Sequence, residues 1–316
     1  MTKAEANQRI DHVIVSRLGN RTRSQIQRLI KQGRAQVSDK TARSNTIVRM
    51  DDIITLNIPA PIPAKPKAQS LPVNILYDDV DLVVVDKPAG MVVHPAAGHT
   101  DGTLVNALLH HVGNLSGVGG VLRPGIVHRL DRGTSGVMVI AKHDRSHTEL
   151  ARQFKEREVT KHYEVLVWGV VQSGRRIDLP VGRDPIERKK ISTRSHRART
   201  ALTRINRAEQ LHGASFLEVS IETGRTHQIR VHLSAIKHPV VGDALYGGVR
   251  RHPIPSMRSV QRLERPFLHA AHLRFRHPSD GRLVEFRSPL PGDLNSVLEA
   301  LRAETMKESV NNYNKN

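Results

Sequence analysis

A single carboxylate, Asp131, stands between two arginines in a short segment that glycines close at both ends. The segment is residues 125–136 (GIVHRLDRGTSG), and an apolar run, residues 137–140, follows it. We expect the neighbouring cations of Arg129 and Arg132 to keep the Asp131 carboxylate ionised. A loop between two strands is a common place for a reactive group. The simpler interpretation of such an acid alone is a turn-capping or ion-paired surface residue.

A tyrosine and an arginine stand in two later segments with a regular pattern. Tyr163 lies near the start of the alternating segment 161–169 (KHYEVLVWG), and Arg230 lies in residues 223–233 (TGRTHQIRVHL). Thr226 can cap a helix that buries a stripe of apolar residues, Ile229, Leu233 and Ile236. Arg230 would then emerge at the edge of the core with a fixed guanidinium. Taken singly, Tyr163 is a sheet-packing residue and Arg230 a helix-surface charge.

The chain is strongly basic and has no cysteine. Its 316 residues include 49 Lys and Arg against 30 Asp and Glu, a formal net charge of +19. This charge favours a polyanionic partner, with nucleic acid first, and an anionic membrane is the rival. No apolar span or basic amphipathic anchor supports the membrane interpretation. The absence of cysteine excludes disulfides, thiolate catalysis and cysteine-ligated metal sites. Residues 1–8 lack the apolar core of a signal peptide, so we expect a cytoplasmic protein.

Histidine is frequent enough to raise the question of a metal site. The chain has 18 histidines, among them the neighbouring pairs His227 with His232 and His269 with His272. No spacing matches a catalytic zinc pattern such as His-Glu-x-x-His. We therefore expect surface or RNA-facing histidines and no metal site.

The N-terminal part, residues 1–58, has the pattern of a small module. Helical spacing in residues 10–18 breaks at Gly19-Asn20, and a second helix is expected from the N-cap Ser24 to Gly33, with Ile26, Leu29 and Ile30 on one face. Residues 35–37 and 53–58 are typical of strands. The exposed face of the second helix would carry Arg23, Gln27, Arg28 and Lys31. One interpretation is a solvated face; the basic composition favours contact with backbone phosphates.

The rest of the chain has an α+β pattern. Residues 59–72 form a proline-rich linker, expected to be extended and semi-stiff. Residues 73–305 alternate short strands (82–85, 137–140, 163–170, 216–221 and 283–286) with occasional helices, which predicts a large mixed or antiparallel sheet. The polar tail, residues 306–316, is expected to be disordered. Residues 183–207 carry nine Lys and Arg and are either an RNA-gripping loop or ribbon, or a disordered basic insertion.

Together, the Asp131, Tyr163 and Arg230 segments resemble the three sequence motifs of the RluA-type pseudouridine synthases. Three further segments support the resemblance: 86–95 (DKPAGMVVHP), 106–109 (NALL) and 242–247 (GDALYG). The N-terminal module resembles the S4 RNA-binding domain through residues 8–11 (QRID) and 23–33. The resemblance covers residues 9 to about 302, and the S4 module in front fits the members that act on large-subunit ribosomal RNA.

The resemblance implies a function, a fold and a set of site residues. The activity is the isomerisation of uridine to pseudouridine in RNA, without metal or cofactor. The fold is α+β: a small S4-type domain and a larger catalytic domain with a mixed, mainly antiparallel sheet. Asp131 is the catalytic carboxylate, which attacks a carbon covalently or removes a proton next to C1′. Arg230 is its ion-pair partner, Tyr163 stacks on the flipped base, and Arg129 occupies the vacated space or contacts a phosphate.

The expected partner is RNA, and the alternatives differ in its kind and in the chemistry. We expect large-subunit ribosomal RNA, or the assembling large ribosomal subunit, as the partner of a monomer. One alternative is a pseudouridine synthase for transfer RNA. The other is a non-catalytic RNA-binding factor in ribosome assembly, which would have no need of an ionised acid facing a negatively charged ligand.

Overall fold

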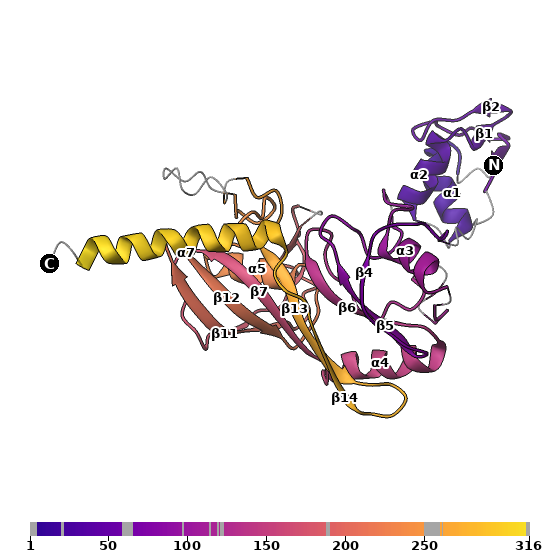
Figure 1. Ribbon diagram of the computed structural model, residues 1–316. Coiled ribbons are helices and arrows are strands. Elements are labelled where there is room, and N and C mark those ends of the chain that lie inside the picture. Colours follow the sequence, from indigo (N-terminus) through magenta and orange to yellow (C-terminus); the bar gives the residue numbers. More distant parts are fainter. Residues whose placement is uncertain are drawn as a thin grey trace. The chain divides into compact units, whose positions relative to one another are not determined.

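The chain divides into two compact units, Met1–Pro63 and Ala64–Asn316 (Figure 1). The computed structural model describes residues 5–19, 22–58, 66–96, 98–113, 115–118, 120, 123–187, 190–249, 260 and 262–313. Each unit has its own hydrophobic core. No helix in these ranges is long and apolar enough to cross a lipid bilayer.

The first unit packs two helices on a three-stranded sheet. The helices are α1 (Ile10–Leu18) and α2 (Arg23–Lys31), and the strands β1 (Ala35–Val37), β2 (Lys40–Thr41) and β3 (Ile54–Leu56) lie in the order β2-β1-β3. The expected apolar face of α2 is buried, which confirms the stripe of Ile26, Leu29 and Ile30. The expected N-cap at Ser24 is wrong: Thr22 caps α2 in a capping box with Gln25, because a glutamine three residues after a threonine satisfies two helix-end amides.

A nine-stranded sheet forms the centre of the second unit. The strand order is β4-β5-β6-β13-β7-β12-β11-β8, and β14 also pairs with β13. Only the pairing of β13 with β6 is parallel among the described strands, so the predicted mixed, mainly antiparallel sheet is confirmed. The strands are β4 (Asn74–Asp78), β5 (Leu82–Lys87), β6 (Ser135–Ala141), β7 (Thr160–Trp168), β8 (Arg176–Asp178), β11 (Leu202–Leu211), β12 (Ala214–Ile221), β13 (Leu268–Arg276) and β14 (Leu283–Arg287).

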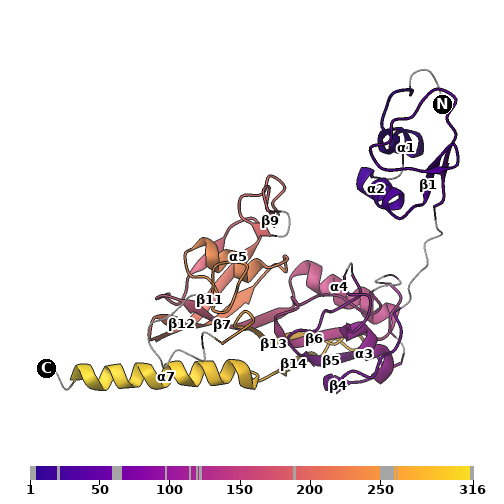
Figure 2. The same cartoon turned by 90° about the horizontal axis from the view of Figure 1, so that it is seen from above.

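The described part of the second unit places four helices on this sheet: α3 (Leu104–His111), α4 (Asp144–Glu156), α5 (Gln228–Ala235) and α7 (Gly292–Tyr313). In Figure 2, α5 and α7 lie on opposite sides of strands β7, β11 and β12. Helix α7 contributes Leu294, Leu298 and Leu301 to the main core, and α5 contributes Ile229 and Leu233. The Asp131 segment, strand β7 and helix α5 all contribute residues to one pocket.

Two boundary expectations need correction. Part of the expected linker belongs to the second unit: the Gln69 amide donates to the Asn106 carbonyl (2.9 Å), and the Asn106 side chain donates to the Lys67 carbonyl (2.8 Å). Residues 59–65 lie outside the described ranges. The expected disordered tail is wrong as far as residue 313, because α7 runs to Tyr313. Strong helix formers continue the helix, and Thr305 accepts the His212 amide (2.9 Å) in the β11–β12 turn.

The basic segment 183–207 is ordered wherever it is described. Strand β9 (Gly182–Arg183) pairs antiparallel with β10 (Ile191–Ser192), and the segment then enters β11. Asp184 accepts the amides of Ile186 and Glu187 in the turn (both 2.9 Å), and these bonds lower the pKa of its carboxyl to about 2. The segment is therefore a β-ribbon, and the alternative of a disordered insertion is wrong for its described residues. Arg188 and Lys189 lie outside them.

Candidate active site

The loop that carries Asp131 is fixed at both ends by glycines in close contact with backbone. Gly125 has φ +71°, and a Cβ there would collide with the Ala141 carbonyl. Gly136 has φ +118° and lies where β6 runs parallel to β13, so a Cβ would collide with the Ala270 backbone. A side chain at either position is therefore excluded by both backbone angle and space. The glycines hold the two ends of the loop against the sheet.

Polar contacts fix the rest of the loop. His128 is partly buried, stacks on Phe154 (centroids 4.5 Å apart) and accepts the Val139 amide at Nε2 (3.1 Å). Burial, with the Lys161 charge nearby, lowers the pKa of His128 to about 3, so the ring is neutral. Arg132 does not pair with Asp131: its Nε donates to the Gly90 carbonyl (3.1 Å), and the Gly90 amide donates back to the Arg132 carbonyl (2.7 Å). The Nε of Arg132 is therefore directed to this turn, and the cation that is hydrogen-bonded to Asp131 comes from elsewhere in the chain.

Arg230 is the cation that pairs with Asp131. Its Nη1 donates to Asp131 Oδ2 (3.1 Å), while its Nε and Nη2 form a two-pronged contact with Asp243 (2.6 and 2.9 Å). The Asp243 side chain is 1% exposed and that of Asp131 is 19% exposed. Burial opposes the charge of Arg230, but the two carboxylates together raise its pKa above the ordinary value. The guanidinium is therefore permanently charged and held in one plane, aimed at the more accessible carboxylate.

Helix α5 positions Arg230 through its N-terminal turn. The N-cap is His227, with φ +55°, in place of the expected Thr226. Gln228 fixes this turn: its Oε1 accepts from Thr223 Oγ1 (2.7 Å) and from the Arg225 amide (3.1 Å), and its Nε2 donates to the Leu202 carbonyl (2.9 Å). Since the Gln228 side chain already binds the preceding turn, a threonine cap is not needed there.

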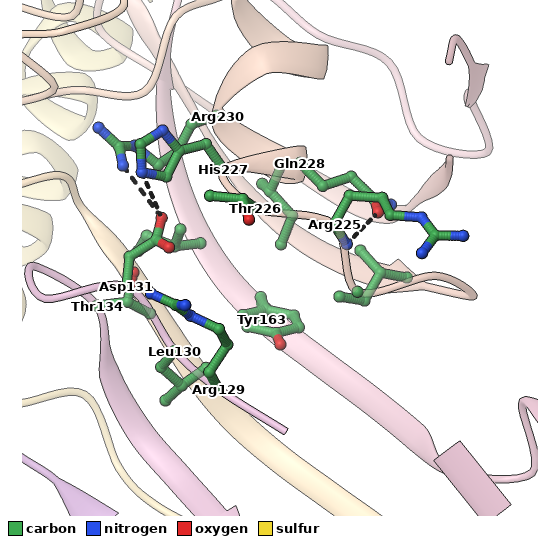
Figure 3. Close-up of a pocket in the computed structure, with 14 residues that line it drawn as sticks. Arg129, Leu130, Asp131, Thr134, Tyr163, Arg225, Thr226, His227, Gln228 and Arg230 are labelled. Atoms are coloured by element: carbon green, nitrogen blue, oxygen red, sulfur yellow. Dashed lines mark hydrogen bonds and ion pairs between the residues drawn. The ribbon is translucent and has the colours of Figure 1, made fainter. Parts of the chain in front are cut away.

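Tyr163 and Arg129 line the same pocket as Asp131 and Arg230. Figure 3 shows Tyr163 on strand β7, across the pocket from the helix that carries His227 and Arg230, with Arg129 beside Asp131. The Tyr163 side chain is buried, and burial together with the Asp131 charge raises the pKa of its hydroxyl. Arg129 is exposed at the rim. The structure thus brings together all four residues that the sequence proposed for this site.

A second groove adjoins the pocket and shares Arg129, Tyr163 and Arg225 with it. We call it the basic groove, because it is lined by the cations Arg123, Arg129, Lys155, Lys161 and Arg225. Burial, together with the charge of Arg157, lowers the pKa of Lys161 to about 8, and its ammonium lies over the Phe154 ring (5.7 Å). The groove can therefore place a chain of phosphates beside the single carboxylate.

Sequence reasoning missed several residues around Asp131. His227 Nε2 lies 3.7 Å from Asp131 Oδ2, and its Nδ1 lies 2.8 Å from the Tyr246 hydroxyl. Asp243 holds the other side of Arg230. The segment 242–247 (GDALYG) was the only signal for Asp243 and Tyr246, since neither carries a local pattern of its own. Lys87 is fully buried and donates to the carbonyls of Pro88 and Met91 (2.8 and 3.0 Å).

The histidines considered as metal ligands have other partners. His232 contacts Thr203 Oγ1 (2.9 Å) and the Leu179 carbonyl (2.8 Å), and His269 contacts Ser135 Oγ and the Ser288 carbonyl (both 3.0 Å). His272 faces Glu285 (3.2 Å). His232 lies within helix α5 and the other two histidines lie on strand β13, and their contacts connect neighbouring elements.

In the first unit, the proposed RNA-contacting residues divide into two kinds. Arg23 is paired with the buried Asp11 (3.0 Å), which also receives Arg9 and Gln27. These donors outweigh burial and lower the pKa of Asp11. Arg28 and Lys31 are exposed and line a groove with Arg43 and the backbone around Thr41. Arg23 therefore has a structural partner, whereas Arg28 and Lys31 face outward.

Comparison with known proteins gives two family matches and a set of full-length relatives. Residues 81–235 match the RNA pseudouridylate synthase family, and residues 8–54 match the S4 domain. An uncharacterized RNA pseudouridine synthase of Aquifex aeolicus is 42% identical over 294 residues, 92% of each chain. The ribosomal large subunit pseudouridine synthase D of Zymomonas mobilis is 40% identical over 305 residues, 95% of this chain and 96% of that one. The solved structure of human RNA pseudouridylate synthase domain containing 1 superposes with a TM-score of 0.54 at 29% identity, covering 75% of this chain and 97% of that chain.

Proposed function

The chain belongs to the RNA pseudouridylate synthase family, and we propose that it isomerises specific uridines of large-subunit ribosomal RNA with Asp131 as the catalytic carboxylate. The observation that carries the assignment of Asp131 is its place in the pocket: a partly exposed carboxylate, fixed by the guanidinium of Arg230, beside a basic groove. Relatives of similar length, from Zymomonas mobilis and Pseudomonas aeruginosa, are named for the large ribosomal subunit, which supports the choice of RNA.

The reaction breaks the N1–C1′ bond of uridine and joins C5 of the uracil to C1′. Atoms and electrons balance within the nucleotide, so the chemistry needs no oxidant or reductant. Asp131 either forms a bond to a carbon of the nucleotide or removes a proton next to C1′, and both routes require the ionised carboxylate. Arg230 contributes a fixed positive charge beside this carboxylate, and its Nη1 hydrogen bond directs one of the two oxygens.

Tyr163 and Arg129 contact the flipped nucleotide or its surroundings in the RNA. A base inside a stack is out of reach of a carboxylate in a pocket, so the target uridine must leave the stack, at a cost of a few kcal/mol. The Tyr163 ring offers a surface on which the uracil can stack, a contact worth about 1–3 kcal/mol per base. Arg129, exposed at the rim of the pocket and shared with the basic groove, occupies the space that the base vacates or contacts a phosphate next to it.

The RNA backbone follows the basic groove and the β9–β10 ribbon. The groove supplies five cations beside the pocket, and the ribbon supplies the exposed Arg183, Arg194 and Arg197. Phosphate neutralisation by these side chains provides most of the binding free energy, so affinity falls as salt rises. The S4 unit adds Arg28 and Lys31 as a second contact with the same RNA.

Asp131→Asn tests the catalytic assignment. The amide keeps the shape of the carboxylate and removes its charge, so we expect pseudouridine formation in a uridine-containing ribosomal RNA fragment to fall at least about 10²-fold while RNA binding is retained. Asp178→Asn, at an exposed carboxylate on β8, is the matched control and should react like the wild type. A wild type that binds the RNA without converting uridine would instead support the non-catalytic assembly factor.

Mapping pseudouridines in cells that lack the protein tests the choice of RNA. We expect modifications to disappear from large-subunit ribosomal RNA and to return when the wild-type protein, but not Asp131→Asn, is supplied. Loss confined to transfer RNA would overturn the ribosomal assignment and leave the chemistry intact.

A further inference from the structure

A chain of polar contacts connects the β9–β10 ribbon to the catalytic pocket. The Ile191 amide in β10 donates to the Tyr246 hydroxyl (3.0 Å), and that hydroxyl lies 2.8 Å from Nδ1 of His227. On the other edge of the same ring, Nε2 lies 3.7 Å from Asp131 Oδ2. A tyrosine and a histidine therefore connect the backbone amide of Ile191, in the basic ribbon, with the Asp131 carboxylate in the pocket.

We propose that His227 and Tyr246 are positioning residues that orient the Asp131 carboxylate and tie its orientation to the β9–β10 ribbon. The inference rests on the proposed catalytic role of Asp131. Arg230 donates a hydrogen bond to Asp131 from one direction, and the His227 ring faces the same oxygen from a second direction at 3.7 Å, which is longer than a hydrogen bond. The ring therefore limits the space in which the carboxylate can turn about its hydrogen bond to Arg230.

The proposal assigns the ring proton of a neutral His227 to Nε2. A backbone amide can only donate, so the Tyr246 oxygen accepts from Ile191, and in the proposed arrangement the hydroxyl donates its own proton to Nδ1. The remaining ring proton then sits on Nε2, facing Asp131. Burial lowers the pKa of His227, and the charged groups around the ring are Asp131, Arg230, Asp243 and Arg129. A neutral ring with Nε2–H therefore points at Asp131 without adding a second full positive charge.

Packing keeps the residues of this series of polar contacts in place. His227 has φ +55°, an uncommon backbone angle for a residue other than glycine, and its carbonyl accepts the Val231 amide (2.9 Å) as the first turn of α5 begins. The Tyr246 ring lies under the Arg230 guanidinium (5.0 Å) and meets the His227 ring edge-on (5.7 Å). Ile191 and Tyr246 both pack on the small apolar cluster Val181, Ala201 and Val231. A displacement of the ribbon therefore moves the hydroxyl that holds His227.

Tyr246→Phe tests the chain by removing one oxygen. The ring stays under Arg230, while Ile191 loses its acceptor and His227 loses its donor. We expect kcat to fall about 10- to 100-fold, because a small displacement of a reacting group carries a cost of that size, with KM changed less than about two-fold. Tyr77→Phe is the matched control: it removes a hydroxyl that donates to Asp79 (2.8 Å) on β4, and kcat should stay at the wild-type value.

His227→Asn and the double variant separate positioning from general damage. Asparagine tolerates the positive φ of residue 227 and lacks the ring. Since both residues act through one contact with Asp131, the double variant Tyr246→Phe/His227→Asn should lose no more kcat than His227→Asn alone. If the two substitutions lower kcat additively, or if they raise KM and leave kcat unchanged, the proposal is overturned.

Nitrogen-15 NMR of labelled histidine checks the proton directly and without RNA. The His227 signals, identified by their absence in His227→Asn, should show a neutral ring with the proton on Nε2 at neutral pH, and Tyr246→Phe should disturb that state. A charged ring or a proton on Nδ1 in the wild type overturns the proposal. Because this measurement needs no turnover, it stands even if the wild type forms no pseudouridine, which would refute the proposed function separately.

Discussion

Arg230 divides its guanidinium between two carboxylates of unequal exposure. Asp243 takes the planar pair Nε and Nη2 and is almost fully buried, so it fixes the plane of the group. Asp131 takes Nη1 and keeps part of its surface open. Breaking a buried pair by removing one partner leaves a charge without compensation. Asp243 is therefore a support for the arginine, and Asp131 is the carboxylate that stays accessible from the pocket.

A second buried side chain, Lys87, makes the free energy of unfolding of the second unit depend on pH. Burial lowers the pKa of Lys87 from 10.5 to about 7, against the favourable charge of Asp131. Below pH 7 the ammonium is charged in both the folded and the unfolded chain, and the folded chain bears the full cost of burying it. Between pH 7 and 10.5 the unfolded chain binds more protons, so the free energy of unfolding rises with pH, by up to about 1.4 kcal/mol per pH unit.

Urea unfolding at pH 7 and pH 9 measures this contribution. Trp168 is the single tryptophan and is buried in the second unit, so its fluorescence follows that unit alone. From pH 7 to pH 9, we expect the free energy of unfolding of the wild type to rise by roughly 2 kcal/mol more than that of Lys87→Met. Lys155→Met, at an exposed lysine, should keep the wild-type pH dependence. Equal slopes for wild type and Lys87→Met would contradict the lowered pKa.

The site residues differ in how far the sequence reveals them. Asp131 is visible locally, because an acid in a glycine-bounded loop is unusual. Its partner Arg230 is 99 residues away, and only the resemblance to a family connected the two. Arg132, which is next to Asp131 in the sequence, instead donates through Nε to the carbonyl of Gly90 in a distant turn. His227 and Tyr246 were not predicted, since their roles depend on the ribbon that approaches them in the folded chain.

At the scale of elements, patterns of apolar residues locate the strands and helices along the sequence, but they do not reveal which strands are neighbours in the sheet. The expected strands 137–140 and 216–221 lie within β6 and β12, and the apolar face of α2 is buried as predicted. The parallel pairing of β6 with β13 brings Ser135 next to His269, and no local pattern records such a distant contact. Helix caps also escaped prediction, because Thr22 and Ser24 both qualify by residue type and the Gln25 side chain selects Thr22.

Gly136 makes that parallel pairing possible, and Gly136→Ala tests it. The substitution places a Cβ against the Ala270 backbone at a φ of +118°. Gly174→Ala is the matched control, because Gly174 also has a positive φ (+80°) but open space around it. We expect Gly136→Ala to lower the free energy of unfolding of the second unit by about 1–3 kcal/mol more than the control. Turnover of the folded fraction should also fall, since the Asp131 loop ends at this contact; equal losses in the two variants would refute this account.

At the scale of the whole molecule, the charge of +19 is distributed over surfaces in both units. The second unit carries the basic groove and the ribbon beside its pocket, and the first unit carries Arg28 and Lys31 on the exposed side of α2. The composition predicted a polyanionic partner without indicating which cations were available for it. The structure separates them: Arg23 is held by Asp11, while Arg28 and Lys31 face a groove.

The salt dependence of RNA binding tests the contribution of the first unit. Each phosphate contact adds about 0.7–0.9 to the slope of log K against log salt concentration. The double variant Arg28→Gln/Lys31→Gln should therefore reduce that slope by roughly 1 to 2 on a ribosomal RNA fragment. Because Arg28 and Lys31 are not among the described residues that line the Asp131 pocket, kcat on a small uridine-containing RNA should remain at the wild-type value. Lys307→Gln removes an exposed cation from α7 and serves as the control. An unchanged slope in the double variant would show that α2 does not contact the phosphates, and a lost kcat would show that the first unit takes part in the chemistry.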